Sequence, residues 1–184
     1  ESSFIDELNG VTVGTIGLDD VLEAIGKAKD NDKIKGIYIE AGMLSADSYA
    51  SLAAIRNALL DFKKSGKWIV AYGDVYTQGT YYVASVADKV FLNPSGQIDW
   101  HGISSQPVFL KDLMAKFGVK MQLAKVGTYK SAPEMYTADK MSDANREQVT
   151  AYVNGIWQNV CKAGSESRKI SVEQLNAYAA NFIT

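Results

Sequence analysis

The sequence contains one cysteine and one histidine in 184 residues. A single cysteine, Cys161, excludes an internal disulfide and any cysteine-rich metal site, and we interpret it as a small buried apolar residue. A single histidine, His101, is the only residue that could complete a Ser-His-Asp triad, and no Gly-x-Ser-x-Gly motif accompanies it. We favour a structural or incidental His101. Without metal-ligand spacing, a GxGxxG motif or a P-loop, we expect no metal and no cofactor.

The sequence also lacks an excess of basic charge and a long apolar run. The net charge of -2 and the pI near 5.5 argue against a nucleic-acid partner. The apolar runs, such as residues 68–72, are strand-sized and far below the ~20 residues of a spanning helix. The chain begins at Glu1 without a methionine or a signal sequence. We therefore expect a segment of a longer protein, with any membrane anchor outside it.

What the sequence does contain is the mixture of an ordinary globular domain, with 47% hydrophobic and 22% charged residues. Its patterns predict strands at residues 11–14, 34–40, 67–72, 90–92 and 119–126. They predict helices up to about residue 29, over 48–64, 79–87, 107–117, 145–161 and 172–180. The strand over 67–72 is continuously apolar, which is typical of a strand buried on both faces.

Local signals refine these boundaries. An aspartate at position 19 or 20 is expected to cap the first helix, and Ser142 and Ser171 to cap the last two. Gly66 is expected to end its helix in a left-handed conformation, and residues 93–96 to form a turn. Strands that alternate with helices predict a layered α/β domain with a mostly parallel sheet. We assign it to residues 1–140, followed by a helical arm over 141–184 that packs on it or on a neighbouring subunit.

Two stretches could carry chemistry. Residues 73–82 (GDVYTQGTYY) join a predicted strand to a predicted helix, so Gln78 would lie at the carboxyl end of a parallel strand. Ligands bind there in α/β folds, and backbone N–H groups can bind an oxyanion. The other interpretation is a connecting loop whose aromatic residues pack in the core. Spacing alone gives the two interpretations equal weight.

The second stretch, residues 126–134 (VGTYKSAPE), surrounds Lys130. An isolated lysine is usually a solvated surface charge. This one follows an apolar segment, and its neighbours are Gly, Thr, Tyr and Ser instead of other charges. Partial burial would favour the neutral amine, which could accept a proton from a hydroxyl. The residues themselves leave both interpretations open.

The sequence resembles the signal peptide peptidase A (protease IV) family of Ser-Lys dyad proteases, in the ClpP/crotonase-like superfamily. The resemblance covers nearly the whole chain, through residues 17–25, 34–40, 81–90, Asn93-Pro94, Gly102 and the run 127–132 (GTYKSA). That last run is the most specific, because Lys130 occupies the place of the family's general base. Thr128 and Ser131 could hydrogen-bond near its amine, and Glu134 is a weaker candidate for local ordering.

The resemblance further implies the amino-terminal half of a duplicated protein. In that form the serine comes from the carboxyl-terminal half, and the serine position of this chain is Gln78, which cannot act as a nucleophile. Gly73, Asp74 and Gly79 are then remnants of the nucleophile motif. Neither Ser131, adjacent to Lys130, nor Ser85, beyond the expected position, is a good substitute.

The implied setting is a homotetramer anchored in the bacterial cytoplasmic (inner) membrane, with its catalytic part on the periplasmic side. Its substrates would be apolar, cleaved signal peptides, and its partner the serine-bearing carboxyl-terminal half. Two alternatives from other classes remain. One is a catalytically silent scaffold that builds the oligomer, and the other is a crotonase-like acyl-thioester enzyme. No sequence feature favours the latter.

Overall fold

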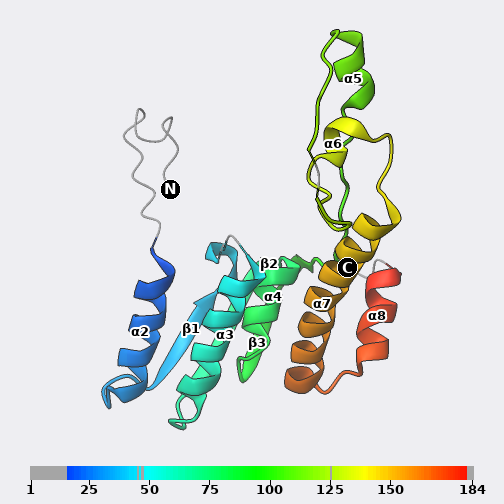
Figure 1. Ribbon diagram of the computed structural model, residues 1–184. Helices are drawn as coiled ribbons and strands as arrows, with labels where there is room; N and C mark the ends of the chain where they lie inside the picture. The colour runs from blue at the N-terminus through cyan, green and yellow to red at the C-terminus, as the bar shows by residue number, and fades with distance from the viewer. Residues whose placement is uncertain (1–15, 45, 47, 125, 182–184) are drawn as a thin grey trace. The chain divides into compact units, whose positions relative to one another are not determined.

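The computed structural model describes residues 16–44, 46, 48–124 and 126–181, so the predicted strand at 11–14 lies outside the described residues. The chain forms two compact units. Unit 1 comprises Glu1–His101 with Ala163–Thr184, and unit 2 comprises Gly102–Lys162. Helix α7 (Asp143–Arg168) begins in unit 2 and ends in unit 1 (Figure 1). The expected division into an α/β domain over 1–140 and an arm over 141–184 stays a prediction.

Unit 1 is built on a parallel sheet of three strands. Strands β1 (Gly36–Glu40), β2 (Trp68–Tyr76) and β3 (Lys89–Ile98) pair in the order β1-β2-β3. Helices α3 (Tyr49–Lys63) and α4 (Gln78–Ala84) make the two crossover connections that parallel strands require. The predicted α/β class with a parallel sheet is therefore confirmed.

One face of this sheet forms the core. Apolar side chains of α3 recur at helical spacing and are buried; they are Leu52, Ile55, Leu59 and Phe62. They belong to the same core as the buried β2 residues Ile69 and Ala71. The alternate residues of the strands point the other way, and Tyr38, Trp68 and Phe91 remain about half exposed. The prediction that residues 67–72 are buried on both faces is therefore wrong, because the helices described cover only one face.

Strand β3 differs from its prediction. Residues 93–96 were expected to form a turn after the strand, yet β3 continues to Ile98. Gly73 pairs with Leu92 and Val75 with Gln97, so a single residue of β2, Asp74, lies opposite residues 93–96 of β3. The expected turn is thus a bulge within the strand, after which the parallel pairing resumes.

The ends of the first helices test the capping predictions. Helix α2 (Leu18–Asp30) begins after Gly17, which makes no side-chain capping bond. Asp19 and Asp20 lie inside its first turn, so the prediction that one of them caps the helix is wrong. Their charges still suit the helix amino terminus. At α3, Ser48 Oγ accepts a hydrogen bond from Ser51 N, and Gly66 has a left-handed φ of 78° after the helix, as predicted.

A buried arginine on α3 forms hydrogen bonds with the last turns of α7. The guanidinium of Arg56, on α3, donates to Tyr82 O and Ser85 Oγ at 2.7 and 2.8 Å. It also donates to Ala163 O and Ser167 Oγ, on the last turns of α7, at 3.1 and 2.6 Å. The acceptors are uncharged, and burial lowers the pKa of Arg56. Helix α8 (Val172–Ala180) follows, and its residue Leu175 accepts a hydrogen bond from Trp100 through its backbone oxygen.

Unit 2 holds two short helices, α5 (Lys111–Lys116) and α6 (Glu134–Thr137), and the first part of α7. Leu110 N donates to Met135 O at 2.6 Å, and Lys111 forms an ion pair of 2.7 Å with Asp139. Helix α6 was not predicted, and the helix expected over 107–117 is limited to the six residues of α5. Ser142, as expected, accepts a hydrogen bond from Asn145 N at the start of α7.

The strand predicted over residues 119–126 is not formed by the described residues of that segment. Val119, Met121 and Leu123 alternate as in a strand, but each side chain is nearly half exposed. A strand needs a neighbour for its backbone hydrogen bonds, and the ladders of the described residues all lie in the sheet of unit 1. The prediction is wrong because the pattern is present without a pairing partner.

Candidate functional site

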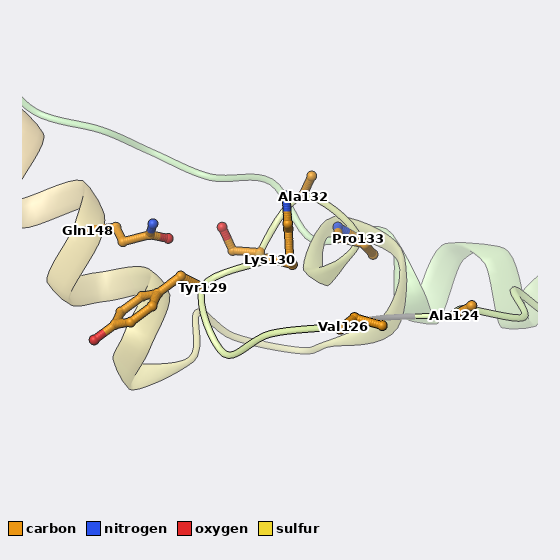
Figure 2. Close-up of a pocket in the computed structure, with 8 residues that line it drawn as sticks. Ala124, Val126, Tyr129, Lys130, Ala132, Pro133 and Gln148 are labelled. Atoms are coloured by element: carbon orange, nitrogen blue, oxygen red, sulfur yellow. The ribbon is translucent and has the colours of Figure 1, made fainter.

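Lys130 lies in an open hollow of unit 2 with a volume of about 650 Å³. The hollow is lined by Ala124, Val126, Tyr129, Lys130, Ser131, Ala132, Pro133 and Gln148. Figure 2 shows Gln148, on α7, at one side of it and Ala124 and Val126 at the other. Lys130 is the only charged residue among these eight. The other seven described lining residues are uncharged, and none of them carries a carboxylate.

The backbone turns sharply just before Lys130. Gly127 has a left-handed φ of 97°, a conformation that favours glycine, and Lys130 N approaches Gly127 O at 3.5 Å. Lys130 itself is exposed. The segment thus presents the lysine at the surface of unit 2, at the end of a turn that follows the apolar residue Val126.

The two residues predicted to support the lysine are placed differently. Ser131 is half buried and lines the hollow, whereas Thr128 is exposed and lies outside the lining residues. Among the described residues, no hydrogen bond joins Nζ of Lys130 to the hydroxyl of Thr128 or Ser131. Their role at the amine stays a prediction.

Residues on both sides of Lys130 form hydrogen bonds with α7 or with its capping residue. The sequence alone indicated these contacts only weakly. Tyr129 donates its hydroxyl to Glu147 Oε2 at 3.2 Å, and this hydrogen bond raises the pKa of Tyr129. Glu134 is buried, and its carboxylate accepts hydrogen bonds from Ser142 and Asn145. The signal available was weak: Glu134 lies four residues after Lys130 and shortly before the helix-capping Ser142.

Gln78 lies in unit 1, where β2 ends and α4 begins. Thr77 caps α4 through its hydroxyl, which accepts a hydrogen bond from Thr80 N at 3.2 Å. The side chain of Gln78 is 5% exposed and donates from Nε2 to the hydroxyl of Tyr49 at 3.0 Å. The predicted location at the carboxyl end of a parallel strand is confirmed, and the side chain found there is held in the interior.

The neighbours of Gln78 pack closely. A Cβ at Gly79 would lie 2.9 Å from Leu52 Cδ1, so a larger residue would require the Leu52 side chain to shift. Gly73 is buried on β2, and Asp74 is exposed and accepts hydrogen bonds from Tyr72 and Asn93 at 2.9 and 2.8 Å. These contacts give the three residues structural roles. Whether they are remnants of a nucleophile motif stays a prediction.

Three other side chains carry groups that could react: Ser85, Cys161 and His101. Ser85 is buried, and its hydroxyl donates to Tyr82 O and accepts from Arg56. Cys161 is buried, which raises the pKa of its thiol to about 11. His101 is exposed, with Nε2 4.0 Å from a carboxylate oxygen of Asp99. The Ser85 hydroxyl is thus occupied by structural contacts, and burial keeps the Cys161 thiol protonated.

Metal-binding clusters and membrane-spanning helices are both absent from the described residues. No group of three or more His, Cys, Asp and Glu side chains is arranged there to hold a metal ion. None of the helices described there combines the length and the apolar character of a membrane-spanning segment.

Comparisons with known proteins agree on one family. Residues 61–183 match peptidase family S49. The chain is 40% identical over 156 residues to Protease 4 of Salmonella typhi and 34% identical over 180 residues to Protease 4 of Haemophilus influenzae. These matches cover 85% and 97% of the chain. It is also 29% identical over 154 residues, or 84% of the chain, to the chloroplastic serine protease SPPA of Arabidopsis thaliana. The matched stretch spans only 23–29% of the length of these relatives.

Proposed function

Because the chain belongs to peptidase family S49, we propose that it supplies the general base of a serine-type protease site and that Lys130 is that base. The observation that carries the proposal is the hollow, in which Lys130 is the only charged residue among the lining residues that the structure describes. A second protein segment placed over this hollow would exclude water from the amine. Desolvation favours the neutral form of an amine, which is the form that accepts a proton.

The chemistry requires a serine that we assign to a partner segment, since Gln78 occupies the nucleophile position of this chain. Neutral Lys130 takes the proton from the serine hydroxyl as its oxygen attacks the substrate carbonyl carbon. The lysine then passes that proton to the leaving amine as the peptide C–N bond breaks. Water hydrolyses the acyl-enzyme with the same base. The oxyanion donors come mainly from the serine-bearing segment, and this chain alone is expected to be inactive.

The full-length protein that contains this chain provides the test. Lys130→Ala is expected to lower kcat by roughly 10²–10⁴-fold, the usual contribution of a general base. Lys130→Arg keeps the positive charge but cannot give up a proton at working pH, so it should be equally impaired. Lys140→Ala removes another exposed lysine of unit 2 and serves as the matched control. Peptidase activity retained by Lys130→Ala would exclude Lys130 as the base.

The alternative function is a catalytically silent scaffold that builds the assembly. Unit 2 exposes large apolar side chains, with Phe117 at 75%, Val126 at 88% and Tyr152 at 69%, which supports contact with other protein surfaces. This alternative predicts normal kcat for Lys130→Ala. It also predicts loss of the oligomer, measured by light scattering, when these apolar residues are replaced.

The setting that we propose follows the family resemblance. The assembly is a tetramer at the periplasmic side of a bacterial inner membrane, anchored by a segment outside this chain, and it degrades apolar, cleaved signal peptides. Two of the relatives are bacterial, which supports a bacterial setting. Protease protection in spheroplasts tests the location. Degradation of a synthetic signal peptide, compared with a polar peptide of equal length, tests the substrate class.

A further inference from the structure

Glu134 is a carboxylate buried in the otherwise exposed surroundings of Lys130. It begins the short helix α6 and is 8% exposed, whereas the residues from Val126 to Lys130 are all exposed. A buried carboxylate is retained only where hydrogen bonds replace the water that it has lost. The partners of Glu134 therefore show what its burial serves.

Those partners lie at the start of α7. Oε1 accepts a hydrogen bond from the hydroxyl of Ser142 at 2.6 Å. Oε2 accepts from Ser142 N at 3.2 Å and from Asn145 Nδ2 at 2.9 Å. Ser142 is also the capping residue of α7, because its hydroxyl accepts from Asn145 N. The positive end of the helix dipole adds to these charge-assisted bonds, so Glu134 is fixed to a helix of 26 residues.

The connection from Glu134 to Lys130 is short. Glu134 N donates to Ser131 O at 2.9 Å, which closes a tight turn immediately after the lysine. Pro133 lies inside this turn with φ at -74°, and its ring restricts the backbone further. A residue fixed at Glu134 therefore restrains the backbone at Ser131, next to Lys130.

The other side of Lys130 has a weaker connection to the same helix. Tyr129 donates its hydroxyl to Glu147 Oε2 at 3.2 Å, and this contact is exposed. Exposed contacts hold less strongly than buried charge-assisted ones. Lys130 is thus bracketed by two attachments to the first turns of α7, and that of Glu134 is the stronger.

We infer that Glu134 is the positioning residue of Lys130: it locks the lysine segment onto the amino terminus of α7, so that the amine is presented in one place. Glu134 does not touch the reacting atoms and acts through the backbone of residues 131–133. The inference rests on the proposed function, because it assigns to Glu134 the placement of the base. Misplacing a catalytic group by about 1 Å can cost ~10²-fold in rate.

Steady-state kinetics of the full-length protein test this role. Glu134→Gln keeps the shape but turns an amide N–H₂ toward hydrogen-bond donors, so kcat is expected to fall by ~10²-fold, with KM changed less than about threefold. Asn145→Ala removes one of the three hydrogen bonds to the Glu134 carboxylate and should give a smaller loss of kcat. Both variants are expected to keep the melting temperature of the wild type. Asp139→Asn, which breaks the exposed ion pair with Lys111 in the same unit, is the matched control and should leave kcat unchanged.

A double variant separates positioning from a general structural role. Lys130→Ala is assayed with an added small primary amine that can restore part of the base function. If Glu134 acts through Lys130, then Lys130→Ala with Glu134→Gln has the same amine-supported rate as Lys130→Ala alone. A further loss in the double variant would mean that Glu134 acts on the fold in general and would overturn the inference.

The outcomes also separate the inference from the proposed function. Normal kcat for Lys130→Ala removes Lys130 as the base, whatever Glu134 does. An inactive Lys130→Ala together with a kcat for Glu134→Gln within about twofold of the wild-type value leaves the proposed function intact and rejects only the role of Glu134.

Discussion

Gln78 and Lys130 both follow an apolar stretch of chain, but their side chains are placed in opposite ways. Gln78 is 5% exposed and bonded to Tyr49, in a unit whose sheet and helices share a core. Lys130 is exposed and lines an open hollow of unit 2, which holds two short helices and the first part of α7. The first position is completed by the chain itself. The second is open, as the proposed function requires, because there another segment is to complete the site.

The largest expected effect is a difference in kcat between variants at these two positions. In the full-length protein, Gln78→Ala should leave kcat within about threefold of the wild-type value, where Lys130→Ala loses roughly 10²–10⁴-fold. The reason is that, in the proposed function, the exposed amine transfers protons, whereas the buried amide contributes packing. Initial rates on one peptide substrate measure both variants. A loss for Gln78→Ala as large as that for Lys130→Ala would make the amide part of the chemistry and remove the contrast.

The next effect concerns the stability of unit 1, which contains a buried hydrogen-bond network around Arg56. Arg56→Ala removes one hydrogen-bond donor from each of two backbone oxygens and two hydroxyls, and we expect it to destabilise the chain by about 3 kcal/mol. Urea unfolding followed by circular dichroism measures the change. Arg146→Ala, at an exposed position of α7, is the control and should stay within about 0.5 kcal/mol of the wild type. A cost below about 1 kcal/mol for Arg56→Ala would show that the arginine network contributes little.

The smallest effect is a pH dependence in unit 1. Asp88 bonds to Lys63 and to Ile69 N, and these contacts lower the pKa of its carboxyl. A carboxyl with a lowered pKa stabilises the folded state above its unfolded pKa of about 4, and this contribution is lost as the pH falls through the folded value. Because the side chain is partly exposed, we expect less than about 1 kcal/mol.

Thermal melts of Asp88→Asn check this sign. The variant should melt below the wild type at pH 7, and the difference should shrink as the pH falls below about 4. Asp32→Asn, at an exposed position, should show no such convergence. A difference between Asp88→Asn and the wild type that persists at low pH would assign the effect to something other than the charge of Asp88.

The sequence predicted the elements of unit 1 better than those of unit 2, for a physical reason. Helix α3 and strand β1 carry apolar residues at the spacing of their own structures, and capping residues such as Ser48 mark their ends. Residues 119–126 carry a strand pattern too, but a strand also needs a partner, which local pattern cannot supply. The bulge opposite Asp74 escaped prediction for a related reason, since pairing across strands decides whether residues 93–96 end a strand or interrupt it.

The candidate site, like the fold, was predictable from the sequence only in part. The segment around Lys130 stood out through its composition and its family resemblance, and the location of Gln78 followed from the alternation of strands and helices. Glu134 was a weaker candidate in the sequence because its role depends on its burial. The residues next to it along the chain do not indicate that it is buried. Its partners, Ser142 and Asn145, are found only once α7 is in place.

The three tryptophans lie in different settings, which makes them optical reporters. Trp68 is about half exposed, on the face of the sheet that the described helices leave open. Trp100 is buried and donates to Leu175 O, and Trp157 lies on the part of α7 within unit 2. Water around an indole shifts its emission to longer wavelength. A binding partner that covers the sheet face would therefore shift the emission of Trp68 to shorter wavelength and leave that of Trp100 unchanged. Single-tryptophan variants would read out, in one titration, which surface of the chain a partner covers.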